Sequence, residues 1–194
     1  MVAKRSFLIL CLFLICSLFG CSFFKKEPAP RVDKICEYYR SANAMTMQVV
    51  LSADFQDQIS EYKVKYIHDK QKNDSIEIIE PEEVSDVKIS VQQGKTEVVF
   101  DGARLETGNL NDRGLTPLNT IPRLIHQWSN GIVTESCLEN RDGLDVILVV
   151  HEDERENLEY RTWFNASDYT PVYSEIYSEG KAAIYCEYEM FSIN

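Results

Sequence analysis

Apolar side chains recur at every second position through much of this chain, and this period constrains the fold more than any other feature of the sequence. Between residues 45 and 51 the recurring positions are Met45, Met47, Val49 and Leu51, and mostly polar residues separate them. The same alternation occurs at residues 62–66 and 87–91, and residues 75–79 form a further short segment. Because alternate side chains of a strand point to opposite faces, these segments predict antiparallel strands with one wet face.

Turn residues divide much of the remaining chain into more strands. Gly94 and the pair Asp101-Gly102 predict turns on either side of a strand at residues 96–101, which a strand at residues 104–107 follows. Clusters of Asn, Asp, Gly, Ser and Pro separate five later segments: residues 132–138, 144–150, 159–165, 172–177 and 182–188. We therefore expect roughly ten strands in the chain.

Two segments have signals of a helix instead. Asp33 is placed to cap a helix that runs to about Ala44. In the centre of the chain, Thr116 and Pro117 form a favourable N-cap and first residue for a second helix. Proline is well suited to that place because its missing N–H would have no partner there.

The second helix carries one apolar stripe, which indicates core packing. Its members recur at three and four residues: Leu118, Ile121, Leu124, Ile125 and Trp128. Pro122 predicts a bend or a restart, because proline removes a backbone hydrogen bond inside a helix. The pair Asn130-Gly131 predicts a left-handed stop at the C-terminal end.

Together these elements predict an α+β fold. We expect a strongly curved antiparallel sheet, an incomplete β-barrel, with the helices packed on its concave side. A sheet that curls without closing leaves an apolar trough. Either the helices fill that trough or a ligand does, and the sequence leaves both alternatives open.

The first residues read as a targeting signal that precedes the fold. Lys4 and Arg5 come before an apolar run at residues 7–20, which has the length of a signal-peptide core and is short of a bilayer span. The run ends in Leu18-Phe19-Gly20-Cys21, which resembles the bacterial lipobox and implies lipidation of Cys21. A buried N-terminal helix or an uncleaved anchor is the alternative.

These features divide the chain into three parts. We expect a lipoprotein signal peptide at residues 1–20, the lipidated Cys21 with its tether at residues 21–32, and one domain at residues 33–194. The acyl chains of Cys21 would hold the domain on a membrane, on the extracytoplasmic side.

Charge and motif content exclude several functional classes. The net charge of −11 argues against nucleic-acid binding, which depends on basic side chains that neutralise phosphates. His68, His126 and His151 are scattered, and His151-Glu152 does not continue to a metalloprotease motif because Arg155 stands where the second histidine is needed. We therefore expect no catalytic residues, no metal and no cofactor.

Residues 109–131 are a basic segment in an acidic protein. Arg113, Arg123, His126 and Trp128 lie in it. One interpretation is an ordinary crossover whose apolar stripe is buried. The other is a lid over the trough or a surface on which a partner docks, and the sequence does not decide between them.

Three cysteines, an odd number, follow the tether. Cys137 and Cys186 both fall in predicted strands and are the pair that we would test for a disulfide in an extracytoplasmic protein. Burial of Cys36, Cys137 and Cys186 as small apolar side chains is the equally reasonable alternative.

The order of these features resembles a known family. The resemblance rests on the lipobox, the N-terminal helix, the central helical crossover and three later segments: residues 97–102, Trp163-Phe164-Asn165 with Thr170-Pro171-Val172, and Glu179-Gly180-Lys181. This layout over residues 33–194 is similar to the LolA/LolB/RseB superfamily of lipoproteins. The resemblance implies an incomplete β-barrel around helices and supplies no catalytic residue.

A narrower resemblance concerns the segment before the central helix. Gly114-Leu115-Thr116-Pro117-Leu118, with Ile121-Pro122 and Trp128 after it, is similar to the clostridial germination lipoprotein GerS and its relatives. It implies a non-catalytic, spore-associated lipoprotein that binds and activates a spore cortex N-acetylmuramoyl-L-alanine amidase.

Two other functional classes remain open beside this one. A carrier would hold the acyl chains of a lipid or a lipoprotein in the trough. An enzyme acting on cell-wall polymer would need two positioned carboxylates or a metal. A long exposed sheet edge could also support exchange of strands between two copies of the chain, giving a homodimer.

Overall fold

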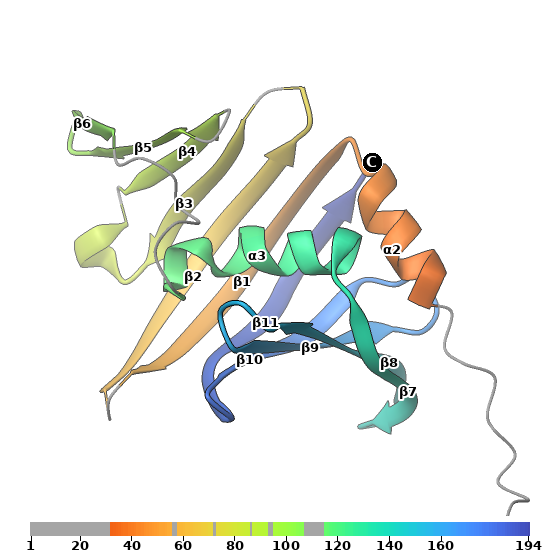
Figure 1. The fold of residues 1–194 in the computed structure, drawn as a ribbon. Coiled ribbons are helices and arrows are strands. Elements are labelled where there is room, and N and C mark those ends of the chain that lie inside the picture. The colour runs from red at the N-terminus through yellow and green to blue at the C-terminus, as the bar shows by residue number, and fades with distance from the viewer. Residues whose placement is uncertain (1–31, 56–57, 72, 86, 93–94, 107–114) are drawn as a thin grey trace, which may run out of the picture.

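The computed structural model describes residues 32–55, 58–71, 73–85, 87–92, 95–106 and 115–194. These residues form eleven antiparallel strands in one sheet, two α-helices and a short 3-10 helix (Figure 1). The sheet curves strongly without closing, and the helices lie on its concave side, so the predicted fold class is confirmed.

The first half of the chain begins with a helix and continues as a meander of strands. Helix α2 (Val32–Ser41) precedes β1 (Ala44–Phe55) and β2 (Gln58–Asp69), each at the segment where the two-residue alternation predicts a strand. The meander continues through β3 (Asp74–Glu80), the 3-10 helix η1 (Glu82–Val84), β4 (Lys88–Gln92), β5 (Lys95–Phe100) and β6 (Ala103–Glu106).

The second half begins with α3 and forms a second meander. Helix α3 (Pro117–Asn130) crosses to β7 (Val133–Arg141) and β8 (Leu144–Asp153). The chain ends with β9 (Leu158–Asn165), β10 (Pro171–Ser178) and β11 (Lys181–Ile193).

The two meanders join into one sheet because the first strand pairs with the last. The strand order is β6-β5-β4-β3-β2-β1-β11-β10-β9-β8-β7, which leaves β6 and β7 as the edges. Asn43 donates its backbone N–H to the carbonyl of Asn194 at 2.8 Å, so the end of the chain is fixed beside the start of β1.

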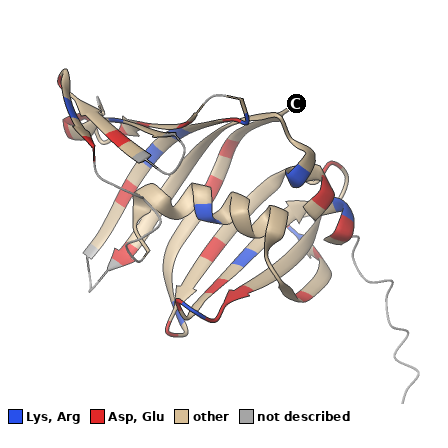
Figure 2. Ribbon diagram, turned by 45° about the horizontal axis from the view of Figure 1, so that its top comes forward, with Lys and Arg blue, Asp and Glu red and all other residues tan. Residues whose placement is uncertain are grey.

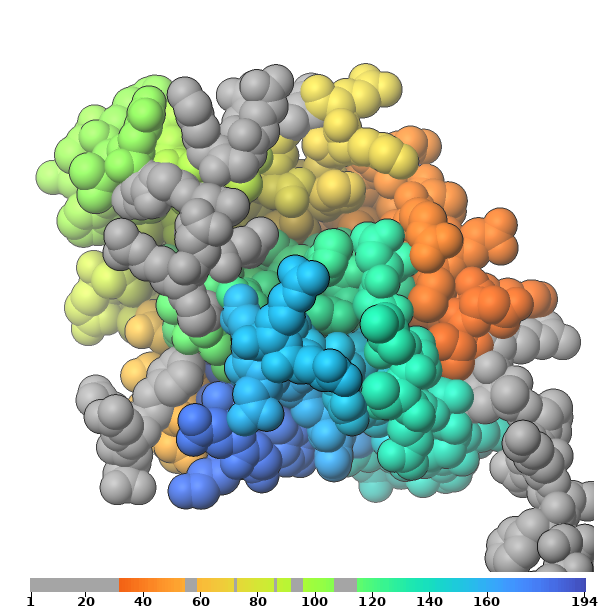
Figure 3. Space-filling model, viewed as in Figure 1, coloured from red at the N-terminus to blue at the C-terminus, as the bar shows by residue number. Residues whose placement is uncertain are grey.

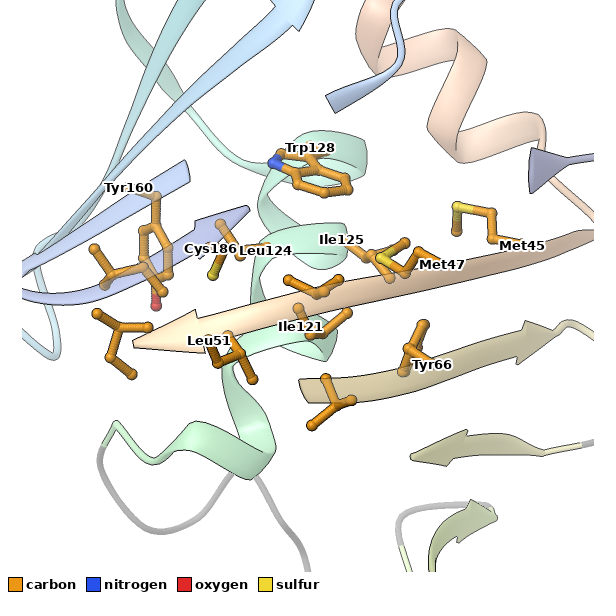
Figure 4. Close-up of a cluster of buried hydrophobic side chains, with 14 of the residues drawn as sticks. Met45, Met47, Leu51, Tyr66, Ile121, Leu124, Ile125, Trp128, Tyr160 and Cys186 are labelled. Atoms are coloured by element: carbon orange, nitrogen blue, oxygen red, sulfur yellow. The ribbon is translucent and has the colours of Figure 1, made fainter. Parts of the chain in front are cut away.

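The concave face of the sheet carries the main core. The alternating residues Met45, Met47, Val49 and Leu51 of β1 are each at most 1% exposed. Figure 4 shows Ile121, Leu124, Ile125 and Trp128 of α3 facing the β1 side chains, with Tyr66 of β2 beside them. Each fully buried aliphatic side chain of this kind contributes about 1.5–3 kcal/mol, so the apolar stripe of α3 is a major source of stability.

The start of α3 forms as its sequence predicts. Asn119 donates its backbone N–H to Thr116 Oγ1 at 3.3 Å, and the Thr116 N–H donates to Asn119 Oδ1 at 2.9 Å. These two bonds make a capping box, with Asn119 in the place that Glu or Gln often takes. The helix then runs through Pro122 to Asn130 as one element, so the predicted restart does not occur.

Two other predictions about helix ends are corrected. Helix α2 begins at Val32, so Asp33 lies in its first turn rather than at the cap, where its carboxylate still favours the positive end of the helix. Gly131 is extended, with φ −67° and ψ 156°, and is not left-handed. Glycine is needed there for space, because a Cβ would lie 2.3 Å from Gln127 Oε1 and 2.7 Å from His151 Cδ2.

Candidate functional site: the cleft beside α3

A surface cleft with a volume of about 560 Å³ lies along α3, between that helix, the end of α2 and the first strands of the sheet. Met45, Tyr66 and His68 line it from β1 and β2, while Pro122 and His126 line it from α3. In Figure 3 the tip of the β8–β9 hairpin, in light blue, lies against α3, and this tip adds Asp153 and Glu156 to the lining.

Trp128, predicted as a docking or lid residue, belongs to the core. Its side chain is 1% exposed, and its indole N–H donates to Thr162 Oγ1 at 2.9 Å. The Thr162 hydroxyl is also hydrogen-bonded to Ser174 Oγ, which in turn contacts Tyr188 Oη, each at 2.9 Å. This chain of hydroxyls fixes α3 to β9, β10 and β11.

Arg123 also serves to hold the fold together. Its guanidinium donates to both carboxylate oxygens of Glu156, at 2.6 and 3.2 Å, and the residue is only 8% exposed. A two-pronged ion pair of this geometry is stronger and more directional than a single contact. It therefore ties α3 to the β8–β9 hairpin and offers no free charge to a partner.

Of the three predicted residues that the structure describes, only His126 is exposed at the surface. It lies on α3 and lines the cleft. Arg113 and the predicted lipidation site Cys21 fall outside the described residues. The interpretation of residues 109–131 as a buried crossover is therefore correct for Arg123 and Trp128, because one helical face carries the apolar stripe into the core.

The structure brings together three polar side chains that sequence reasoning did not connect. The Asp74 carboxylate accepts a hydrogen bond from Tyr66 Oη at 2.8 Å and contacts His68 Nδ1 at 2.7 Å. This hydrogen bond to Asp74 raises the pKa of His68, although partial burial opposes the shift. Alternation along β2 could have revealed part of the group, since Tyr66 and His68 share one face of the strand.

A cation that also lines the cleft, near the C-terminal end of α2, links the two helices. Arg40 of α2 donates from Nε and Nη2 to the carbonyl of Ser129 in α3, at 3.1 and 2.7 Å. The carbonyl is neutral, so the positive charge of Arg40 is not cancelled by this contact. Lys70 lies close by, because its backbone N–H donates to the carbonyl of Asn43 just beyond α2.

The expected disulfide between Cys137 and Cys186 is not formed. Both are free thiols. Cys186 of β11 is fully buried in the concave core, whereas Cys137 of β7 packs against a second cluster on the other face. Three strands separate β7 from β11 in the sheet, so the pair was wrong because strand order, rather than strand membership, decides which residues meet.

That second cluster covers the convex face of β7 to β10. Val146, Leu148, Val150 and Trp163 are buried in it. Arg141 lies over the ring of Trp163, with its guanidinium carbon 4.5 Å from the ring centroid, and the Trp163 indole N–H donates to Glu139 Oε2 at 2.8 Å. The sheet is thus apolar on both faces near its β7 edge.

Figure 2 shows acidic and basic residues distributed over both halves of the sheet and over the helices. Within the described residues, no group of three or more His, Cys, Asp or Glu side chains is arranged to hold a metal ion. No helix in the described part of the chain has the length and apolar character needed to cross a membrane.

Comparisons with known proteins show similarity at the level of the fold. No family model matches the sequence, and the search of curated proteins also found no match. An uncharacterized conserved protein from Thermus thermophilus superposes with a TM-score of 0.53 at 8% identity, covering 84% of this chain and 85% of that one. A LolA superfamily protein from Nitrosomonas europaea gives 0.43 at 12% identity, with coverage of 86% and 94%. The chain therefore shares its overall fold with the Thermus thermophilus protein.

A solved complex is also found at a lower TM-score. It contains the CwlD amidase from Clostridioides difficile and the GerS lipoprotein, with a TM-score of 0.37, 12% identity, and coverage of 88% of this chain and 96% of that one. At this level of similarity the match supports no conclusion about role, which has to be argued from the residues of this chain.

Proposed function

We propose that this chain is a non-catalytic lipoprotein, anchored through Cys21, whose LolA-like domain binds and regulates another extracytoplasmic protein. The observation that supports this proposal is the filled trough. The concave side of the sheet is occupied by the protein's own side chains from α2 and α3, including Ile35, Tyr39, Leu124 and Trp128, which are at most 2% exposed. The recognition surface is then on the outside of the domain.

The same packing disfavours the carrier hypothesis. A carrier needs an apolar cavity for acyl chains, and pockets that enclose most of a ligand have volumes of about 300–1,000 Å³. In the described part of the chain the cleft beside α3 has such a volume, but it lies at the surface and is lined by several charged groups, among them Arg40, Lys70 and Asp74. An acyl chain in this cleft would remove these charged groups from water and offer them no hydrogen bond in return, which is costly.

The edge formed by β7 and the β7–β8 turn is the surface that we assign to the protein partner. β7 is the last strand of the sheet, so one side of its backbone is free to pair with an added strand. Leu138 and Leu144 flank this edge and are 54% and 38% exposed. Exposed leucines beside unpaired backbone groups favour docking, because a partner strand can form backbone hydrogen bonds and apolar contacts at the same time.

For the partner we propose a spore cortex N-acetylmuramoyl-L-alanine amidase. This part of the proposal rests on the sequence resemblance of residues 114–118, Ile121-Pro122 and Trp128 to the GerS group. The domain would act by holding the amidase at the membrane surface and changing its activity, while the amidase supplies the chemistry.

Binding to the amidase and its activity provide the test. The protein and the amidase are co-expressed and purified, and the hydrolysis of peptidoglycan by the amidase is measured with and without the protein. We expect a stable complex and altered amidase activity. Absence of both a complex and an effect on activity would refute the amidase as partner.

A pair of leucine variants tests the assigned surface. Leu138→Glu on β7 should weaken the complex at least about tenfold, because a carboxylate replaces an exposed apolar contact. Leu105→Glu is the matched control, since Leu105 is 64% exposed on β6, the opposite edge of the sheet. Equal binding by the two variants would remove the β7 edge from the proposal and leave the rest intact.

The anchor is tested separately. Cys21→Ser prevents lipidation, so we expect the variant to leave the membrane fraction while the unaltered protein stays in it. Retention of Cys21→Ser in the membrane would favour the alternative of an uncleaved N-terminal anchor.

A further inference from the structure

The cleft beside α3 has properties that binding at the β7 edge does not explain. It is a concave site lined by histidine, lysine, arginine and aromatic side chains, and it lies on the concave side of the sheet, near the ends of α2 and β2. A cleft of about 560 Å³ is within the range of volumes found for small-molecule sites.

The carboxylates that line the cleft all have partners within the protein. Glu156 is paired with Arg123, and Asp74 is engaged by Tyr66 and His68. Asp153 lies on the β8–β9 side of the cleft, where its carboxylate accepts hydrogen bonds from the backbone N–H groups of residues 155 and 156.

The cations at the α2 end of the cleft are different. Arg40 contacts a neutral carbonyl, and the exposed side chain of Lys70 has no carboxylate partner among the described residues. These two positive charges lie at one end of a cleft in a protein with a net charge of −11. Positive charge confined to a cleft concentrates anions there.

His68 adds a directed donor to this end. Its Nδ1 is held by Asp74 at 2.7 Å, and Nε2, the other ring nitrogen, has no partner among the described residues. The hydrogen bond to Asp74 raises the pKa of His68, and when the ring is protonated Nε2 carries an N–H that can donate to an anion. The second oxygen of Asp74 is occupied by Tyr66, which keeps the carboxylate and therefore the ring in place.

Part of the cleft wall is apolar. Pro122 and Ile125 of α3, Met45 of β1 and Val91 of β4 contribute to the lining, beside polar side chains of α3 such as His126 and Gln127. A small inorganic anion would leave these apolar side chains exposed to water. A ligand that carries an apolar group beside its negative charge would cover these side chains and contact the cations at the same time.

We propose that this cleft binds a compact organic anion, a carboxylate or phosphate ester joined to an apolar body. The anionic group lies against His68, Lys70 and Arg40, and the body lies along Pro122 and Ile125 of α3. This ligand site is additional to the protein partner, and it does not depend on the β7 edge.

Matched small molecules test the ligand class. Binding of phenyl phosphate and benzoate to the purified protein is measured by calorimetry at pH 6.5, with phenol and inorganic phosphate as the two halves of the ligand. We expect phenyl phosphate and benzoate to bind at least about tenfold more tightly than either half. If phenol binds as tightly as phenyl phosphate, the cations do not contribute to binding. If inorganic phosphate binds as tightly, the apolar wall does not contribute. Either result overturns the proposal, as does absence of binding by both phenyl phosphate and benzoate.

Two variants and a matched control test the assigned residues. Lys70→Gln and His68→Gln should each weaken binding of phenyl phosphate about tenfold, since each removes one charge-assisted hydrogen bond. Lys65→Gln removes the same charge from the opposite face of β2 and should leave binding unchanged. Equal weakening by Lys65→Gln would show that overall charge, rather than the cleft, attracts the anion.

Folding and site occupancy are checked independently of affinity. Lys70 has an exposed side chain, so Lys70→Gln is expected to fold even if His68→Gln does not. In the unaltered protein, nitrogen NMR of the histidine rings should show a shift of His68 Nε2 when phenyl phosphate is added, with His151 unaffected. A shift of His151 alone, or of neither ring, would contradict the assigned position.

Discussion

The hydroxyl chain under α3 gives the sharpest prediction about stability. The Trp128 indole N–H donates to the Thr162 hydroxyl, which is hydrogen-bonded to the Ser174 hydroxyl, and Ser174 is hydrogen-bonded to the Tyr188 hydroxyl. The distance between the two heavy atoms is 2.9 Å in each of the three hydrogen bonds. Thr162 and Ser174 are completely buried. Thr162→Val preserves the shape of the side chain and removes only the hydroxyl.

The loss can be worked out from the partners that remain. Ser174 keeps Tyr188 as a partner, but the indole N–H of Trp128 loses its acceptor at a site that is 1% exposed. A buried donor without a partner costs about 1–3 kcal/mol. We therefore expect Thr162→Val to lower the free energy of unfolding by about 2 kcal/mol.

Urea unfolding followed by tryptophan fluorescence measures this change as a shift of the midpoint at constant slope. Thr134→Val is the control, because Thr134 is exposed on β7 and its hydroxyl makes a long contact of 3.4 Å; it should change stability by less than about 0.5 kcal/mol. In a Trp128→Phe background the orphaned N–H is absent, so Thr162→Val should cost about 1 kcal/mol less. Equal effects of Thr162→Val and Thr134→Val would refute the reasoning.

Three further predictions concern Gly131, His151 and the cysteines. Gly131→Ala places a Cβ 2.7 Å from the backbone carbonyl oxygen of Gln127, which cannot move away as a side chain can. We therefore expect a loss of about 2 kcal/mol in thermal unfolding experiments, and wild-type stability would show that the end of α3 can move. Burial lowers the pKa of His151 to about 4, so the unfolded chain takes up a proton at this residue that the folded chain does not as pH falls below 6.5. This residue alone should lower the free energy of unfolding by about 2 kcal/mol from pH 7 to pH 5, measured as the difference in slope between the unaltered protein and a His151→Leu variant; equal slopes would contradict this. Mass spectrometry of the oxidised protein should show no Cys137–Cys186 bridge, and iodoacetamide should modify the buried Cys186 only after unfolding; modification of the native protein at Cys186 would mean that the β11 core opens.

The strands and the central helix could be predicted because their signals are local. Met45 to Leu51 alternate and are buried as the alternation requires, and the stripe from Ile121 to Trp128 faces the core as its spacing requires. The end of α3 shows the limit of such signals. Gly131 is at the predicted stop, but the reason is contact with Gln127 and His151, and His151 is twenty residues further along the chain.

The candidate site was harder to predict because its members come from separate elements. His68 and Asp74 are close in sequence, yet only the pairing of β2 with β3 brings their side chains together above the cleft. Arg123 looked like a free cation until the β8–β9 hairpin supplied Glu156. The sequence shows where a charged residue lies along the chain. Its ion-pair partner depends on which distant segment the fold brings next to it.

By itself the sequence determined the strand set, the two helices and the curved, open sheet, since each follows from the period of apolar residues along a few turns or strands. Only the tertiary structure decided that α2 and α3 fill the trough, that Cys137 and Cys186 lie on opposite faces, and that the α2 end of the cleft is cationic. The physical reason is that burial and charge pairing are properties of residues distant in the chain, which become neighbours only when β1 and β11 join the two meanders into one sheet.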